Sequence, residues 1–191
     1  FWRLLSGLGI PHVTLLDLDA GRHQGGWGRL RYALRQHRAH SGAPVDFVNE
    51  DFSNLPAWDS ADRPDTNDIG IKVIEQLEEV GVYFSAPLDL VSAMLRAYAS
   101  AYGVTAPDPD SVDGGAITAV LGKSHGPIEQ YNHDEQALFD AYGERFKRGS
   151  KPATHIAALA RLSDDDLVTN LPEVYRRVIS AIVTRLEGIA E

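Results

Sequence analysis

Two aspartates, Asp17 and Asp19, directly follow an apolar run and are the residues of this chain best suited to chemistry. The run over residues 13–16 is typical of a strand buried on both faces. The side-chain period of two then puts both carboxylates on one face, with Cα atoms roughly 6–7 Å apart. At the carboxyl end of a parallel strand, such a pair suits a hard cation such as Mg²⁺. The alternative is that Asp17 ends the strand and Asp19 caps a turn, where Asp is common.

A basic segment comes next in the chain. Residues 20–45 contain no acid, and they carry histidines and the arginines Arg22, Arg29, Arg31, Arg35 and Arg38. A basic segment beside a pair of acids is able to hold a phosphate backbone near a metal. The alternative is an ordinary solvated helix face.

The elements that must position these residues alternate between strand and helix patterns. Strands are predicted at 13–17, 45–48, 82–85 and 116–121, and helices at 29–40, 69–80, 87–98, 134–147, 153–162 and 171–189. Residues 52–68 and 105–115 are polar and loop-like, and 163–166 are typical of a helix cap. The alternation predicts an α/β fold with a parallel sheet.

Length and composition narrow the class of protein. The 191 residues suit one domain, or one domain with a helical appendage, and the chain has no cysteine for disulfides or a thiolate zinc site. A net charge of −9 argues against nonspecific nucleic-acid binding over the whole surface. No apolar run reaches the length of a membrane span, so we expect a cytoplasmic protein. The sequence starts at Phe1 inside an apparent helix, and we therefore expect a fragment of a larger protein.

Four stretches of the chain, in order and spread over most of its length, carry a family resemblance. They are residues 9–19 (GIPHVTLLDLD), 26–29 (GWGR), 83–90 (YFSAPLDL) and 149–155 (GSKPATH). Together they resemble the Toprim (topoisomerase–primase) domain of OLD-family ATP-dependent endonucleases. The resemblance implies a Toprim-like Rossmannoid parallel sheet flanked by helices. It implies one nuclease domain over 1–191, of which 123–191 is a mainly helical extension, after an ATPase domain that this chain lacks.

The same resemblance implies a function and its residues. In that family the Toprim domain cuts DNA with divalent metals, Mg²⁺ or Mn²⁺, and ATP acts through the separate ATPase domain. The resemblance implies metal ligation by Asp17, Asp19 and Asp89, with Asp17 also catalytic, and a catalytic lysine, Lys151, near the scissile phosphate. Two such ions about 3.5–4 Å apart activate a water and stabilise the leaving oxygen. It further implies a homo-oligomer, DNA as partner, and a role in defence against phage.

The chain departs from the family pattern at two points. The family's first Toprim strand carries a glutamate, and this chain begins after that strand. Related sequences place a second acid at the position of Val91, and Lys147 lies close to Lys151 in the sequence. One alternative is therefore a catalytically degenerate Toprim that docks DNA or dimerises. Another is a phosphatase-type hydrolase with Asp17 as nucleophile, although Gly21 stands where such enzymes carry Thr or Val.

Overall fold

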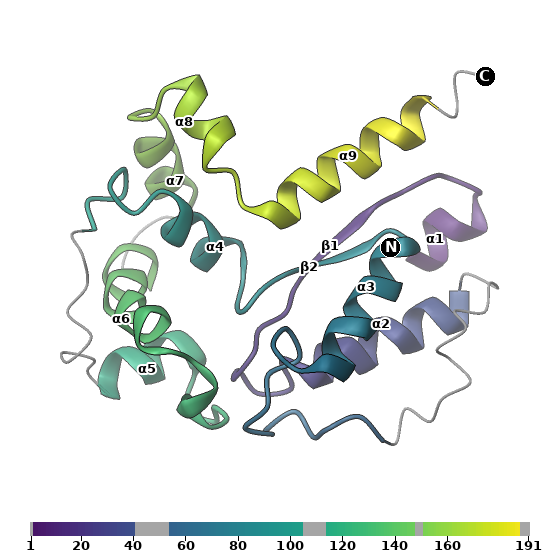
Figure 1. Ribbon diagram of the computed structural model, residues 1–191, viewed down its shortest axis with the longest axis horizontal. Coiled ribbons are helices and arrows are strands. Elements are labelled where there is room, and N and C mark those ends of the chain that lie inside the picture. Colours follow the sequence, from purple (N-terminus) through teal and green to yellow (C-terminus); the bar gives the residue numbers. More distant parts are fainter. Residues whose placement is uncertain (1, 41–53, 105–113, 148–150, 188–191) are drawn as a thin grey trace.

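The computed structural model describes residues 2–40, 54–104, 114–147 and 151–187. In this part the protein is a mixed α/β structure, mostly helical, with a small parallel sheet (Figure 1). The strands are β1 (Thr14–Asp17) and β2 (Val82–Ser85). The helices are α1 (Trp2–Gly7), α2 (Trp27–His40), α3 (Asp68–Glu79), α4 (Leu90–Ala97), α5 (Gly114–Leu121), α6 (His133–Tyr142), α7 (Lys151–Leu159), α8 (Asp164–Thr169) and α9 (Glu173–Glu187), with a 3₁₀ turn at Ile128–Gln130 and a π turn at Gly143–Lys147. The α/β prediction is confirmed at this level.

The two strands run parallel, with Asp17 opposite Ser85 at their carboxyl ends. The pairing continues into the loop after β1, where the N–H groups of residues 18–20 donate to carbonyls of residues 85–88 at 2.7–3.0 Å. The two loops that follow the strands are therefore held together by their backbones. Side chains from both loops meet at this edge of the sheet.

The two strands differ in burial. β2 is buried along its length, whereas β1 is only half-buried and its last residue, Asp17, is exposed. The prediction that β1 is buried on both faces is wrong. In the described part of the chain β1 pairs only with β2.

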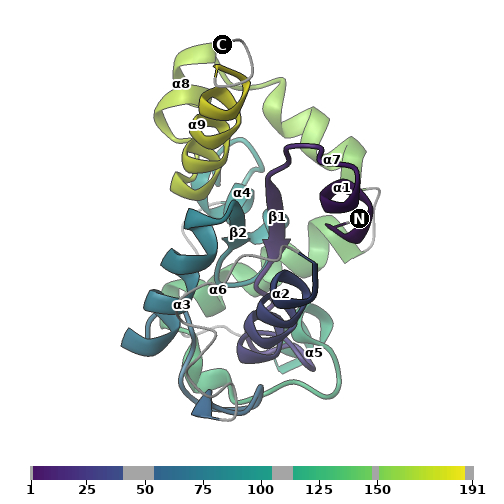
Figure 2. The same cartoon turned by 90° about the vertical axis from the view of Figure 1, so that its right-hand side faces the viewer.

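Buried side chains form two hydrophobic cores beside the strands, one with α2 and α3 and the other with α4, α5 and α6. Figures 1 and 2 show where these helices lie. Residue Leu18, after β1, belongs to the first core, and Ala20, two positions later, belongs to the second. The segment between them, with Asp19, thus crosses from one core to the other. Burial on both sides fixes the position of this segment.

The amino ends of four helices follow rules visible in the sequence. Side chains of Asn67, Asp89, Asn132 and Ser163 each accept a backbone N–H at the start of α3, α4, α6 and α8. The capping segment predicted at 163–166 is one of these, with Asp166 completing a capping box. Such a cap contributes about 1 kcal/mol of stability.

The apolar run 116–121 forms part of helix α5, so the strand predicted there is wrong. A short apolar run fits a buried strand and a buried helix equally well. Here Val120 and Leu121 pack into the second core, and Gly122 follows with φ +91°, a conformation that ends helices. The strand predicted at 45–48 lies outside the described residues.

Among the described helices, none has the length and apolar character needed to cross a membrane.

Candidate functional site: a carboxylate–arginine cluster

The first carboxylates of the site come from the end of β1. The strand stops at Asp17, and Asp19 adopts the left-handed conformation with φ +55°. The side-chain period of two holds only within the strand, so it does not apply to Asp19, whose position is set by the turn. Asp is one of the few residues that tolerate this conformation. Gly25 packs so closely that any Cβ there would overlap the Asp19 carbonyl oxygen, which explains a glycine at this position.

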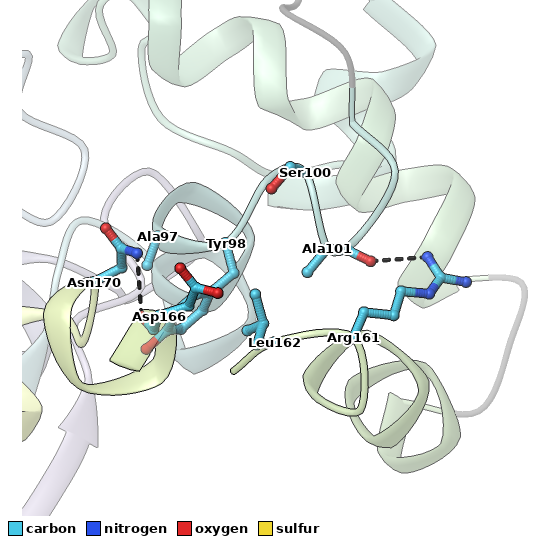
Figure 3. Close-up of a pocket in the computed structure, with 8 residues that line it drawn as sticks. All are labelled: Ala97, Tyr98, Ser100, Ala101, Arg161, Leu162, Asp166 and Asn170. Carbon is cyan, nitrogen blue, oxygen red and sulfur yellow. Dashed lines mark hydrogen bonds between the residues drawn. The ribbon is translucent and has the colours of Figure 1, made fainter. Parts of the chain in front are cut away.

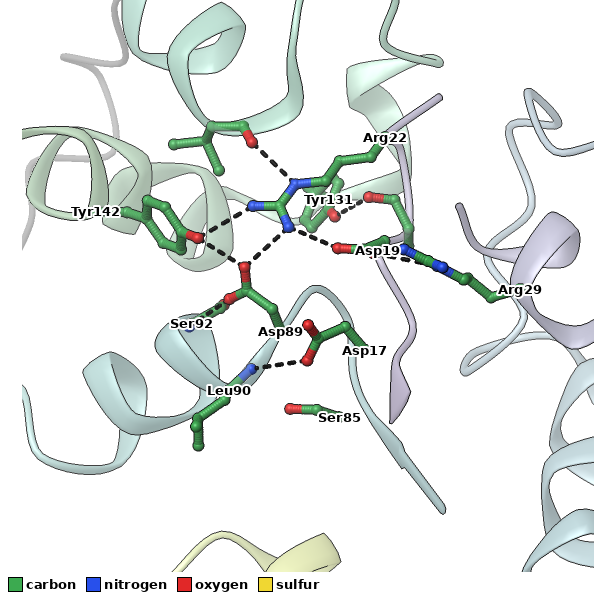
Figure 4. Close-up of polar contacts among 12 residues, drawn as sticks. Asp17, Asp19, Arg22, Arg29, Ser85, Asp89, Leu90, Ser92, Tyr131 and Tyr142 are labelled. Atoms are coloured by element: carbon green, nitrogen blue, oxygen red, sulfur yellow. Dashed lines mark hydrogen bonds and ion pairs between the residues drawn. The ribbon is translucent and has the colours of Figure 1, made fainter. Parts of the chain in front are cut away.

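The third carboxylate comes from the end of β2. Asp89 follows the cis Ala86–Pro87 bond and is the N-cap of α4, where it accepts the Ser92 N–H at 2.9 Å. Its side chain is almost fully buried. The backbone pairing of the two loops brings Asp89 next to Asp19 and Asp17 (Figure 4).

Arg22 lies between Asp19 and Asp89. One guanidinium nitrogen, Nη1, donates to Asp19 Oδ1 at 2.5 Å and to Asp89 Oδ2 at 2.9 Å (Figure 4). The other nitrogens donate to the Val120 carbonyl at 3.0 Å and to the Tyr142 hydroxyl at 3.1 Å. Arg22 thus joins both loops to helices α5 and α6. We call Asp17, Asp19, Asp89, Arg22, Arg29 and Tyr142 the carboxylate–arginine cluster.

Two further side chains complete the contacts to the buried acids. Arg29 donates to Asp19 Oδ2 at 2.6 Å, so each oxygen of Asp19 bonds to an arginine. Tyr142 donates its hydroxyl proton to Asp89 Oδ2 at 2.6 Å. Tyr131 fixes the same loop by donating to the Ala20 carbonyl at 2.5 Å.

The pKa values of Asp17 and Asp89 are shifted in opposite directions. The pKa of Asp17 is raised, first by loss of hydration and then by the negative charges of Asp89 and Asp19. Burial alone would raise the pKa of Asp89, but the hydrogen bond from Tyr142 and the charge of Arg22 outweigh it and lower the pKa. Asp17 is therefore the carboxylate of this cluster whose charge is least compensated.

The expected catalytic lysine lies near the cluster but outside its hydrogen bonds. Lys151 is exposed at the start of α7, and its Nζ lies 6.0 Å from the centre of the Tyr142 ring. The pKa of His155 is lowered by burial and then by the charge of Lys151, while Asp89 raises it. Lys151 thus lies near Tyr142, the residue whose hydroxyl donates to Asp89. The side chain of Lys147 lies outside the description.

Sequence reasoning missed three contributors to the site. Arg22 was expected in a basic phosphate-binding segment, and the sequence predicts no role for Tyr142 or Tyr175, which fall in the helices predicted at 134–147 and 171–189. Tyr175 places its hydroxyl 3.2 Å from Ser85 Oγ, and its pKa is raised by burial and then by Asp17 and Asp89. Apart from the Arg22–Asp19 pair, which is three positions apart, the partners of these residues lie 53–120 positions away in the chain, so local spacing does not mark them.

The basic segment divides into two parts. Arg22 and Arg29 turn toward the acids, and Arg31 donates to the Leu55 carbonyl. Arg35 and Arg38 stay exposed on α2. Arg29 is also exposed but bonds to Asp19, so Arg35 and Arg38 are the residues that best match the expectation of a surface open to phosphates.

The oxygen ligands of the cluster match the chemistry of a hard cation only in part. In the described ranges, no group of three or more His, Cys, Asp or Glu residues is arranged to hold a metal ion. Asp19 and Asp89 bond to Arg22, which occupies the position between them. Mg²⁺ is commonly bound by one or two carboxylates and several waters. The residues therefore fit a cation at Asp17, and in this arrangement they do not fit a three-carboxylate ligand set.

A separate pocket of about 280 Å³ lies between the end of α4, the turn that follows α7, and α8 (Figure 3). Its polar groups are used inside the protein, because Tyr98 donates to the Leu167 carbonyl at 2.7 Å and Arg161 to the Ala101 carbonyl at 2.9 Å. None of the sequence-predicted site residues lines it. The carboxylate–arginine cluster remains the better candidate for chemistry.

Comparison of the chain with protein-family models, with curated proteins and with solved structures finds no match. The resemblance to the OLD-family Toprim domain therefore stays a prediction from the sequence.

Proposed function

We propose that this chain is a Toprim-like module that hydrolyses phosphodiester bonds of DNA with a divalent metal, within a larger ATP-dependent nuclease. The observation that carries the proposal is the meeting of Asp17, Asp19 and Asp89 at the carboxyl ends of two parallel strands. Open α/β sheets bind their ligands at this edge. The left-handed conformation of Asp19 adds support, since such backbone strain gathers at functional sites.

In this proposal each residue has a limited role. Asp17 holds the cation, which when bound polarises the phosphate and lowers the pKa of a water. Asp19 and Asp89 keep the loop edge closed through Arg22, and Lys151 offsets negative charge on the phosphate. The exposed Arg35 and Arg38 attract the DNA backbone from α2.

The test is cleavage of supercoiled plasmid by the full-length protein that carries this chain, with Mg²⁺ or Mn²⁺ and with EDTA. Asp17→Asn keeps the size of the side chain and removes the charge that holds the cation. Because metal catalysis is worth several kcal/mol, we expect the cleavage rate to fall on the order of 100-fold or more. Asp165→Asn, an exposed acid on α8, is the matched control and should cleave like the wild type. Equal rates for both variants contradict the proposal.

One observation favours a second candidate, a non-catalytic module that docks DNA or forms dimers. Both oxygens of Asp19 and one of Asp89 are already bonded to arginines, as in a structural ion-pair network. Such a module would bind DNA without cutting it under any divalent metal. The same plasmid assay, read together with DNA binding, separates the two functions.

A further inference from the structure

Arg22 is placed as a bridging cation would be. Its guanidinium contacts one oxygen from Asp19 and one from Asp89, carboxylates that lie 70 positions apart and belong to different loops. In two-metal sites, two divalent ions about 3.5–4 Å apart stabilise the attacking and leaving oxygens of the displacement. Here a side chain of the protein itself supplies the positive charge between the two acids.

The surroundings of Arg22 hold it in that place. Its Nε donates to the Val120 carbonyl at 3.0 Å and its Nη2 to the Tyr142 hydroxyl at 3.1 Å, so three nitrogens of the guanidinium have partners. The planar fork of an arginine loses little freedom for each hydrogen bond it forms. A divalent ion could take this position only by displacing all of these contacts together.

We propose that Arg22 occupies the position of a second metal, so that the site holds a single divalent cation, at Asp17. This inference rests on the proposed function and makes Arg22 a positioning residue. The number of charges supports this inference, because the cluster contains three carboxylates but only two guanidiniums, Arg22 and Arg29, which pair with Asp19 and Asp89. The uncompensated charge belongs to Asp17, the exposed acid at the strand end.

The experiment counts Mn²⁺ bound to the full-length protein, by isothermal titration in the absence of nucleotide and by electron paramagnetic resonance. We expect one ion per chain at this site in the wild type and none in Asp17→Asn, which corrects for ions bound in other domains. Arg22→Met removes the bridging charge, keeps an apolar stem and should admit a second ion. Arg22→Lys keeps the charge and should bind one ion like the wild type. Arg96→Met, which breaks a distant ion pair with Glu135, is the control and should also bind one.

Two results overturn the inference. One is two ions in the wild type at this site, after subtraction of the Asp17→Asn count; this result needs no Arg22 variant and so holds even if Arg22→Met fails to fold. The other is a folded Arg22→Met protein that binds the same number of ions as the wild type. Plasmid cleavage separates this inference from the proposed function. Cleavage with two ions bound rejects only the role of Arg22, whereas one bound ion without cleavage rejects only the nuclease.

Discussion

Two of the arginine–carboxylate networks in the described part of the chain differ in charge balance and exposure. The carboxylate–arginine cluster at the sheet edge contains three acids and two arginines. Arg22 and Arg29 pair with Asp19 and Asp89, whereas the exposed Asp17 accepts the Leu90 N–H. The second network joins Arg63 and Arg96 to Asp65 and Glu135, so its charges are equal in number. We call it the balanced network.

The balanced network ties the segment before α3 to helix α6. Arg63 donates to Glu135 at 2.7 Å and pairs with Asp65 at 2.7 Å, and it lies over the Tyr131 ring at 5.3 Å. Arg96 bonds to the second oxygen of Glu135 from α4. Every charge in this network has an opposite charge as partner, which is the usual arrangement for buried ions that serve structure.

The cluster and the balanced network use the same residue types but differ in charge balance. In the balanced network each charged side chain is paired with an opposite charge, so no excess charge remains for a ligand. The carboxylate–arginine cluster has one excess carboxylate, Asp17, at the end of β1, and our proposal assigns the cation to this acid. This difference in balance supports a functional role for the cluster and a structural role for the balanced network.

The largest effect is expected from breaking the balanced network with Arg63→Met. Removing one partner of a buried pair leaves an uncompensated buried charge, so we expect unfolding to become easier by about 3–5 kcal/mol. Arg96→Met is the matched control, because Arg96 is half exposed and its pair should contribute less than about 1 kcal/mol. Urea denaturation measures both. Similar losses for the two variants would remove the distinction between buried and exposed pairs.

A smaller loss is expected from Tyr142→Phe in the cluster. The variant removes the hydroxyl that donates to Asp89, and hydrogen bonds to charged groups contribute about 1.5–3 kcal/mol. Tyr98→Phe removes a hydroxyl that donates to a neutral carbonyl, and should cost about 0.5–1.5 kcal/mol. Denaturation curves of the two variants rank the bonds. A larger loss for Tyr98→Phe would argue that Asp89 does not depend on Tyr142.

The smallest expected effect, from Asp17→Asn, is a gain of stability rather than a loss. Because the folded pKa of Asp17 lies above its ordinary value of 3.8, the stability from this group is present below pH 3.8 and is lost as the pH rises through the folded pKa. Asp17→Asn should therefore stabilise the protein at pH 7, by up to about 0.5 kcal/mol as for surface substitutions. The gain should shrink below pH 3.8. A loss of stability at pH 7 would show that Asp17 serves the fold.

Asp89 should behave in the opposite way with pH. Its folded pKa lies below the ordinary value of 3.8, so its contribution is present above pH 3.8 and is lost as the pH falls through the folded pKa. Asp89→Asn should accordingly destabilise the protein at pH 7 and have less effect in acid. Thermal melts of the wild type and the variant between pH 2.5 and pH 7 compare the two slopes. Parallel curves would contradict the assignment.

Local patterns predicted most helices and both strands of the described sheet, because the 3.6-residue period and the helix caps depend on residues that are close in the sequence. The run 116–121 was wrongly predicted as a strand, since its length fits a strand and a helix alike. Its contacts with α6 decide that it forms a helix. The pair Asp17 and Asp19 marked the site. The position of Asp19 and the bridge through Arg22 could not be predicted, because they depend on a turn and on partners from three distant segments.

The most direct measurement compares one acid from each network in plasmid cleavage by the full-length protein with Mn²⁺. Asp17→Asn and Asp65→Asn each remove one negative charge, and circular dichroism at the assay temperature establishes that both are folded. We predict that Asp17→Asn loses cleavage and Asp65→Asn keeps it. Cleavage by Asp17→Asn at the wild-type rate would contradict the account, because the excess charge at the strand end would then serve no catalysis.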